Sequence, residues 1–222
     1  MRQAIRFAVS ASFLALATIG LAFSPSLSAQ QIQAAIKAGS VQVSPRHGYS
    51  WKGYLLKQFD DGLNVPKNSV VDAVVVATPF ERLQFQSYLE TYQGQPLSQA
   101  AASKLASRYR DTIAFLVFAH TPSSATSQRG FLNHFGPGYL TISGQASALR
   151  TKAVKQDGPS YDYFQVTGVG TRFRWLGDVI YTFNLASLVR AGVDVHDLRG
   201  NFRFTDMNGK QYQIPFNLAE FR

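Results

Sequence analysis

The sequence of 222 residues contains no cysteine, and this absence excludes several kinds of protein. A disulfide scaffold, a Cys-ligated zinc site, an iron–sulfur cluster, a thiol nucleophile and a lipid-modified cysteine anchor all need the missing thiol. Charge is also sparse, since only 16% of the residues are charged, whereas 45% are hydrophobic and 13% are aromatic. Disordered chains have the opposite composition, so we expect a chain that buries an aromatic core.

Acidic residues are few as well, because 13 Asp and Glu stand against 22 Lys and Arg. The formal net charge is therefore +9, which favours anionic partners. Net charge defines neither a fold nor a reaction, so the positions of the cations along the chain matter more than their number.

The first 29 residues have the pattern of a secretory signal peptide. Two arginines precede an apolar stretch over residues 7–23, and residues 27–29 end with the small residue Ala29 before a predicted cut at Gln30. The alternative is an uncleaved anchor helix, for which this apolar stretch is slightly short. We expect residues 1–29 to be removed and the protein to be exported, to the periplasm or to the external medium.

Removing residues 1–29 takes away two arginines and no acid, which leaves 20 basic and 13 acidic residues and a net charge of +7. The remaining 193 residues, 30–222, have the length of one domain. An exported domain without cysteine depends on packing for its stability, in agreement with the aromatic content.

Two apolar strands are expected in the first half of this domain. Residues 70–78 form a run of Val and Ala in which Asp72 is the sole charged residue. Residues 112–120 are apolar on both alternating faces and end at His120. Runs that are apolar on both faces predict strands buried within a sheet.

A helical hairpin is predicted between these two strands, over residues 79–110. Thr78 is placed as the N-cap of the first helix, with a proline at the first helical position, and Ser98 caps the second helix. A separate short helix is expected over residues 30–38, ended by Gly39.

The C-terminal segment predicts a β-hairpin. Phe202 and Phe204 alternate with polar residues, and Asn208-Gly209 supplies a tight turn. Pro215 on the return strand predicts an edge strand, because proline cannot donate a ladder hydrogen bond. Further short strands are expected over residues 41–43, 50–56, 139–143, 149–155, 161–167, 172–175 and 179–185.

This succession of short strands, interrupted by one helical pair, predicts a mainly β fold. We expect an antiparallel β-sandwich, immunoglobulin-like in general architecture, with the helical hairpin of residues 79–110 inserted between core strands. A doubly wound parallel sheet would need a helix between most strands, and the sequence does not provide them. The predicted organisation is a signal peptide followed by a single β-sandwich domain over residues 30–222.

No catalytic motif is recognisable, and no catalytic residue is assigned. The densest polar cluster contains Asp194, His196 and Asp197, in which an imidazole between two carboxylates has the composition of a general base or a metal site. We expect a surface turn there, since Asp side chains commonly accept hydrogen bonds from backbone N–H groups within turns. His120 and His134 flank a long loop and are the second histidine candidate.

Neither a metal nor a cofactor is predicted. No two histidines have the i, i+4 spacing of a helical zinc motif, no cysteine can assist, and no third ligand is apparent beside His120 and His134. No Walker motif, EF-hand spacing or kinase signature is found in the sequence.

Basic side chains recur at every second residue of two predicted strands, so each pair shares a strand face. If these strands are neighbours, four cations cluster on one sheet face with two tyrosines nearby, where they can hold phosphate or carboxylate groups. The alternative is a solvated sheet face whose cations protect it against aggregation. The predicted ligand-binding residues are Arg150, Lys152, Arg172, Arg174, Tyr161 and Tyr163.

These observations favour an exported, non-enzymatic binding or interaction module of the envelope or the extracellular space. The expected partner is an anionic envelope polymer, a lipid headgroup or a protein, whereas sequence-specific nucleic-acid binding and a transmembrane span after signal cleavage are not expected. Two alternatives stay open. One is an exported hydrolase with a histidine–carboxylate or metal site, and the other is an assembly subunit that pairs through the Pro215 edge strand.

Overall fold

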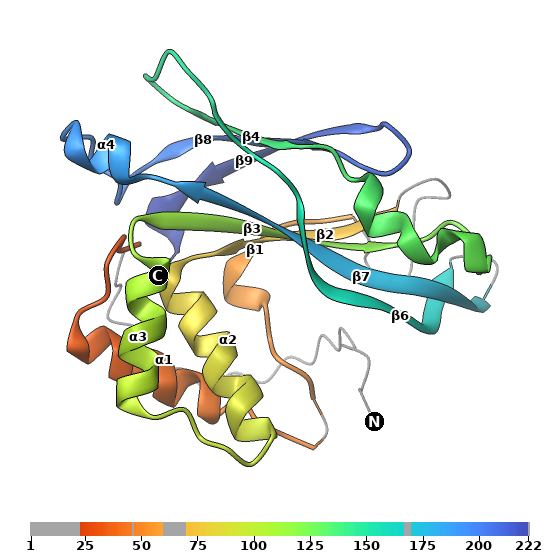
Figure 1. Cartoon of the computed structure of the whole chain (residues 1–222), viewed down its shortest axis with the longest axis horizontal. Helices are drawn as coiled ribbons and strands as arrows, with labels where there is room; N and C mark the ends of the chain where they lie inside the picture. The colour runs from red at the N-terminus through yellow and green to blue at the C-terminus, as the bar shows by residue number, and fades with distance from the viewer. Residues whose placement is uncertain (1–22, 46, 60–69, 167–169, 222) are drawn as a thin grey trace.

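The computed structural model describes residues 23–45, 47–59, 70–166 and 170–221, without the side chains of residues 155–158, 163–166 and 171. Two antiparallel sheets and a group of helices make up this part of the chain (Figure 1). The prediction of a mainly β chain with antiparallel sheets and an inserted helical pair is confirmed, whereas the immunoglobulin-like strand arrangement stays a prediction.

The larger sheet has five strands in the order β1-β2-β3-β7-β6. Its two central partners β2 and β3 are the apolar runs of the sequence, and they are buried along nearly their whole length. The longest strand, β7, is continuous through residues 176–178, which separate the two strands predicted over residues 172–175 and 179–185. The bounds are β1 Leu55–Gln58, β2 Val71–Ala77, β3 Thr112–His120, β6 Val154–Val166 and β7 Gly170–Asn184.

The smaller sheet has four strands in the order β5-β4-β8-β9. The C-terminal hairpin forms as predicted, and β9 is an edge strand with Pro215 opposite Asn201. The segment predicted as one strand over residues 149–155 is instead divided, because β5 ends at Thr151 and β6 begins in the other sheet. The bounds are β4 Gly138–Ile142, β5 Leu149–Thr151, β8 Arg199–Thr205 and β9 Gln211–Asn217.

Helix starts agree with their capping signals. Thr78 accepts a hydrogen bond from the backbone N–H of Glu81, and Ser98 accepts one from the N–H of Ala101. The long connection predicted after His120 contains helical turns, and the segment over residues 41–43 is not a strand. The bounds are α1 Ala29–Ser40, η1 Lys52–Tyr54, α2 Pro79–Tyr92, α3 Gln99–Tyr109, η2 Thr126–His134, α4 Ala186–Arg190 and η3 Leu218–Glu220.

The five-stranded sheet lies between the helices α1–α3 on one side and the four-stranded sheet on the other (Figure 1). On β3, Phe115 stacks on Phe202 of β8 with ring centroids 4.4 Å apart, whereas Phe118 contacts Trp51 at 5.5 Å. Because successive strand residues point to opposite faces, odd-numbered residues of β3 meet the second sheet and even-numbered ones meet the helical side.

Gly39 does not end α1, contrary to the prediction, because the helix continues to Ser40. The glycine is needed where α1 crosses α2. A Cβ atom at this position would lie 2.1 Å from the carbonyl oxygen of Gln84 and 2.8 Å from Cβ of Ser87. Ser87 also donates a hydrogen bond to the carbonyl of Ile36 at 2.7 Å, so the two helix backbones are held in close contact.

Residues 1–22, which include most of the predicted signal peptide, lie outside the described residues. In the part of the chain that the structure describes, no helix has the length and apolar character needed to cross a membrane.

We expect Gly39→Ala to lower the free energy of unfolding by about 1–3 kcal/mol, because the added methyl group overlaps the α2 backbone. Urea denaturation measures this change. Gly53→Ala is the matched control, since no heavy atom lies within 4 Å of a Cβ built there. A Gly39→Ala variant that is as stable as Gly53→Ala would contradict the close approach of α1 and α2.

Candidate functional site

A row of polar and aromatic residues crosses the four-stranded sheet on the face that points away from the core. Arg150 of β5 is paired with Tyr139 of β4, Tyr139 with Arg203 of β8, and Arg203 with Gln213 of β9. Directly paired residues of antiparallel strands have side chains on the same face, so these four side chains form one continuous row. We call this row the arginine–tyrosine row.

The orientation of the row follows from the core. Phe202 and Phe204 of β8 are buried against the five-stranded sheet, so Arg203 between them must point outward. On β9, the buried Tyr212 and Ile214 likewise leave Gln213 outside.

The β8–β9 turn fixes the register of this hairpin. The Asp206 carboxylate accepts hydrogen bonds from the N–H groups of Asn208 and Lys210 through Oδ1, and from the Tyr212 hydroxyl through Oδ2 at 3.0 Å. Gly209 has φ +81°, a left-handed conformation that glycine adopts without steric cost. The turn thus holds Arg203 and Gln213 side by side.

The outer face carries unbalanced positive charge. The four strands contain the three arginines 150, 199 and 203 and no acidic residue. Arg199 is paired with Asp197 at 3.0 Å, whereas neither Arg150 nor Arg203 forms an ion pair within the described part of the chain. Arg150 lies over the Tyr139 ring at 5.7 Å, which holds its guanidinium above the sheet without neutralising it.

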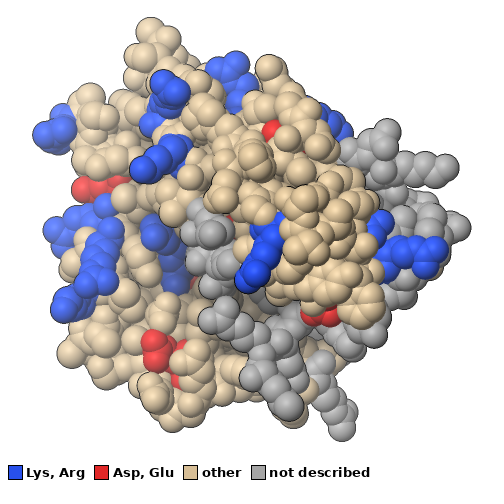
Figure 2. Space-filling view, turned by 45° about the vertical axis from the view of Figure 1, so that its right-hand side comes forward, with Lys and Arg blue, Asp and Glu red and all other residues tan. Residues whose placement is uncertain are grey.

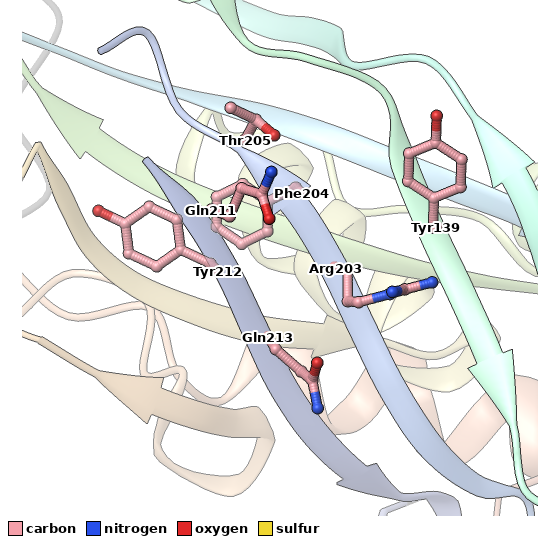
Figure 3. A pocket seen from close by; sticks show the side chains of 7 residues that line it. All are labelled: Tyr139, Arg203, Phe204, Thr205, Gln211, Tyr212 and Gln213. Atoms are coloured by element: carbon pink, nitrogen blue, oxygen red, sulfur yellow. The ribbon is translucent and has the colours of Figure 1, made fainter. Parts of the chain in front are cut away.

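A pocket that is partly open to solvent lies along this row (Figure 3). The side chain of Arg203 extends from β8 toward β4, beside Tyr139, and the amide groups of Gln211 and Gln213 project from β9. Arginine and amide groups supply hydrogen-bond donors, which suit an anionic or strongly polar ligand. The pocket is lined by Tyr139, Arg203, Phe204, Thr205, Gln211, Tyr212 and Gln213.

The wider surface is basic too. In the view of Figure 2, lysine and arginine side chains are spread over the surface, with more of them toward the left, and few acidic side chains are visible. Lys152 follows β5 and is exposed, as is Arg150. These two predicted residues belong to the same edge of the four-stranded sheet.

The two predicted pairs of cations do not lie on neighbouring strands. Arg172 and Arg174 belong to β7 of the five-stranded sheet, whereas Arg150 belongs to β5 of the other sheet. Which strands become neighbours depends on pairing between residues that are far apart in the sequence, and the spacing of the basic residues does not reveal that pairing. Instead, the structure pairs Arg150 through Tyr139 with Arg203, a residue that the prediction did not include.

The predicted tyrosines belong to the hairpin of β6 and β7. Tyr161 stacks on Phe173 at 5.2 Å and contacts Trp175 at 5.0 Å. By strand alternation these rings lie on the face of β7 opposite to Arg172 and Arg174. The side chain of Tyr163 lies outside the described residues.

The histidine cluster near the C-terminus has structural contacts. Asp194 accepts a hydrogen bond from the backbone N–H of His196, and Asp197 forms an ion pair with Arg199. The Nδ1 atom of His196 is bonded to the carbonyl of Phe23. These contacts agree with the expected surface turn and bring no second catalytic group to His196.

His120 has a partner that the sequence analysis did not assign. Its Nδ1 lies 2.6 Å from Oδ1 of Asp72, and both side chains are largely buried, with 5% and 13% exposed. Asp72 lies where the β2–β3 pairing shifts register, so the two residues bond across a β-bulge. The sequence does mark Asp72 as a residue that needs a buried partner, since it is the sole charged residue in its apolar run. Its proximity to His120 depends on pairing.

The groups around this pair are held by other contacts. The buried Thr121 hydroxyl donates to the carbonyl of Ser123 at 2.6 Å and accepts from the N–H of Trp175. The proton of this hydroxyl is therefore engaged, which does not suit a nucleophile. His134 is exposed at the end of η2. Among the described residues, no group of three His, Asp or Glu side chains has a metal-binding arrangement.

One acid is buried between the helices and the five-stranded sheet. Glu81 is 1% exposed, and the Tyr49 hydroxyl donates a hydrogen bond to its Oε1 at 3.2 Å. Burial raises the pKa of Glu81 to about 8, so its carboxyl group is protonated at neutral pH. Burial, and then the nearby Glu81, raise the pKa of Tyr49 above its ordinary value, so that hydroxyl stays a donor.

Comparison of the chain with protein-family models, curated proteins and solved structures found no match in any of the three. The site is therefore interpreted from its own geometry.

We expect Glu81→Gln to stabilise the protein increasingly as the pH rises from about 5 to 9. The raised pKa makes the folded state bind a proton that the unfolded state has lost, so wild-type stability falls across this interval, while a neutral amide does not titrate. The expected gain at pH 9 is about 1–4 kcal/mol. Urea unfolding at several pH values measures it.

The matched control is Glu90→Gln, which removes a partly exposed carboxylate from the same helix. Equal pH dependence of stability in wild type and Glu81→Gln would contradict a buried, protonated Glu81.

Proposed function

We propose that the protein is an exported, non-enzymatic module that binds an anionic polymer of the envelope or extracellular space through the outer face of its four-stranded sheet. The immunoglobulin-like sandwich expected from the sequence would serve as the rigid scaffold for this face. Residues on strands of a packed sheet are held more precisely than residues on loops, which suits a binding surface.

The arginine–tyrosine row is the observation that supports this proposal. Two arginines that form no ion pair with a described acidic residue flank one tyrosine, on a face whose strands contain no Asp or Glu. Neighbouring strands are about 4.8 Å apart, so the Cα positions of Arg150 and Arg203 are separated by about 10 Å. Each guanidinium can therefore contact a separate anionic group of one extended ligand.

The openness of the face favours a polymer over a small metabolite. Sites for small molecules usually enclose most of the ligand in a concave, mainly apolar pocket. Here Arg203, Gln211 and Gln213 are all exposed, and the pocket that they line is partly open to solvent. A long polyanion gains affinity by contacting several exposed cations at once and by releasing its counterions.

The other predicted residues extend the proposal. Arg172, Arg174 and the tyrosine ring of Tyr161 are exposed or partly exposed on the β6–β7 hairpin. They stay predicted ligand-binding residues apart from the arginine–tyrosine row, with the two arginines on one face of β7 and Tyr161 on the opposite face. A lipid headgroup or an acidic protein would meet the same cations, but an extended polymer uses the whole length of the row.

We expect the double variant Arg150→Gln/Arg203→Gln to bind dextran sulfate about 10- to 100-fold more weakly than wild type at low salt, since each lost arginine removes one charge-assisted contact. The slope of log affinity against log salt concentration should fall by about one per arginine. Isothermal titration at several salt concentrations gives both quantities, with uncharged dextran as the control ligand.

Lys104→Gln/Arg108→Gln is the matched control variant. It removes the same charge from exposed positions of α3, in the helical layer on the other side of the five-stranded sheet (Figure 1). An equal loss of affinity in both variants would mean that net charge alone governs binding. Unchanged binding in the Arg150/Arg203 variant would show that the arginine–tyrosine row is not the binding site. The variant Arg172→Gln/Arg174→Gln then tests the β6–β7 hairpin.

A hydrolase is the second candidate, and the His120–Asp72 contact favours it, because a carboxylate that bonds Nδ1 orients an imidazole as a general base. We expect that, if ester or amide hydrolysis is detected, Asp72→Asn lowers the rate at least about 100-fold. Binding of dextran sulfate should stay unchanged in this variant. Hydrolysis that survives the substitution would exclude the pair from catalysis.

A further inference from the structure

The segment just before the predicted signal cut belongs to the folded core. Phe23 is completely buried and is a member of the large apolar cluster that also contains Phe115 and Phe202. Leu27 packs against the smaller cluster formed by α1, α2 and α3. A segment that is removed after export has no need to bury large apolar side chains in the domain.

The backbone of this segment is bonded to two connections that are distant in the sequence. The carbonyl of Phe23 is bonded to Nδ1 of His196, and the carbonyl of Pro25 accepts a hydrogen bond from the N–H of Asp111 at 2.8 Å. Asp111 has φ +53°, which is uncommon for a non-glycine residue, and its own carbonyl accepts from Leu185. The segment therefore secures a strained turn at the start of β3.

The first turn of α1 depends on the same segment. Ser28 accepts a hydrogen bond from the N–H of Gln31 at 3.2 Å, and the Gln31 side chain accepts from the N–H of Ser28 at 2.8 Å. This reciprocal capping box satisfies two of the free N–H groups of the helix. A cut after Ala29 would remove it, and would put a positive amino group at the positive end of the helix dipole.

We propose that residues 23–29 stay in the exported protein, so that any signal cleavage occurs at or before the Ala22–Phe23 bond. The proposal rests on the expectation of export, but not on the ligand-binding role of the arginine–tyrosine row. The sequence supplies a suitable peptidase motif there, because Gly20 and Ala22 place small residues three positions and one position before Phe23. The Ala29–Gln30 bond, in contrast, lies within the first turn of α1.

The test is the mass of the intact protein after the full chain is expressed with export in a Gram-negative host. An N-terminus at Phe23 or upstream of it supports the proposal, and an N-terminus at Gln30 overturns it. Ala29→Glu separates the two cuts further, since an acidic residue before the bond blocks cleavage at Gln30. The processed chain should then begin at the same residue as wild type, and loss of processing in this variant would overturn the proposal.

A second measurement tests the structural premise independently of processing. Phe23→Ala in the full chain should lower the melting temperature by about 6–20 °C, because it empties a fully buried aromatic position. Ser26→Ala, at an exposed position of the same segment, is the control and should leave the melting temperature unchanged. Equal melting temperatures in the two variants would show that the segment does not belong to the core, and would overturn the proposal. Loss of dextran sulfate binding is not expected in either variant, which separates this inference from the proposed function.

Discussion

The contact between the two sheets is the interaction on which the rest of the structure depends. Phe115 of β3 stacks on Phe202 of β8, and Tyr181 and Phe204 extend this aromatic layer. A chain without cysteine has no disulfide between its sheets, so burial of these rings holds the sheets together. The same contact directs Arg203 outward, because a strand that buries Phe202 and Phe204 must expose the residue between them.

Several polar side chains inside this protein are held in pairs, each at a defined place in the fold. Glu81 bonds Tyr49 between helix and sheet, His120 bonds Asp72 at a bulge, and Asp206 bonds Tyr212 beneath the hairpin turn. Leaving a buried polar group without a partner costs more free energy of folding than its hydrogen bond contributes. Arrangements that break these pairs are therefore disfavoured, and the pairs fix the register and position of their elements. Arg150 and Arg203 of the outer face take no part in these buried pairs.

Much of the local structure was readable from the sequence, since its signals act within a few residues. The cap at Thr78, the apolar runs of β2 and β3, the Asn208-Gly209 turn and the edge position of Pro215 all depend on neighbours in the chain. The prediction for Gly39 was wrong because a glycine near a helix end has two explanations. Only the packing of α1 against α2 distinguishes a helix stop from a close backbone approach.

The sequence alone indicates most of the strands, the helical hairpin, the basic excess and the alternation that puts Arg203 on the face of β8 opposite to its buried neighbours. Strand pairing comes from the tertiary structure, which puts Arg150 beside Tyr139 and, through Tyr139, in one row with Arg203, while Arg172 and Arg174 belong to the other sheet. It also placed Phe23 in the core and Asp72 beside His120. Strand pairing and core packing bring together residues that are distant in the chain, and the residue pattern within one segment does not specify which distant segment it will contact.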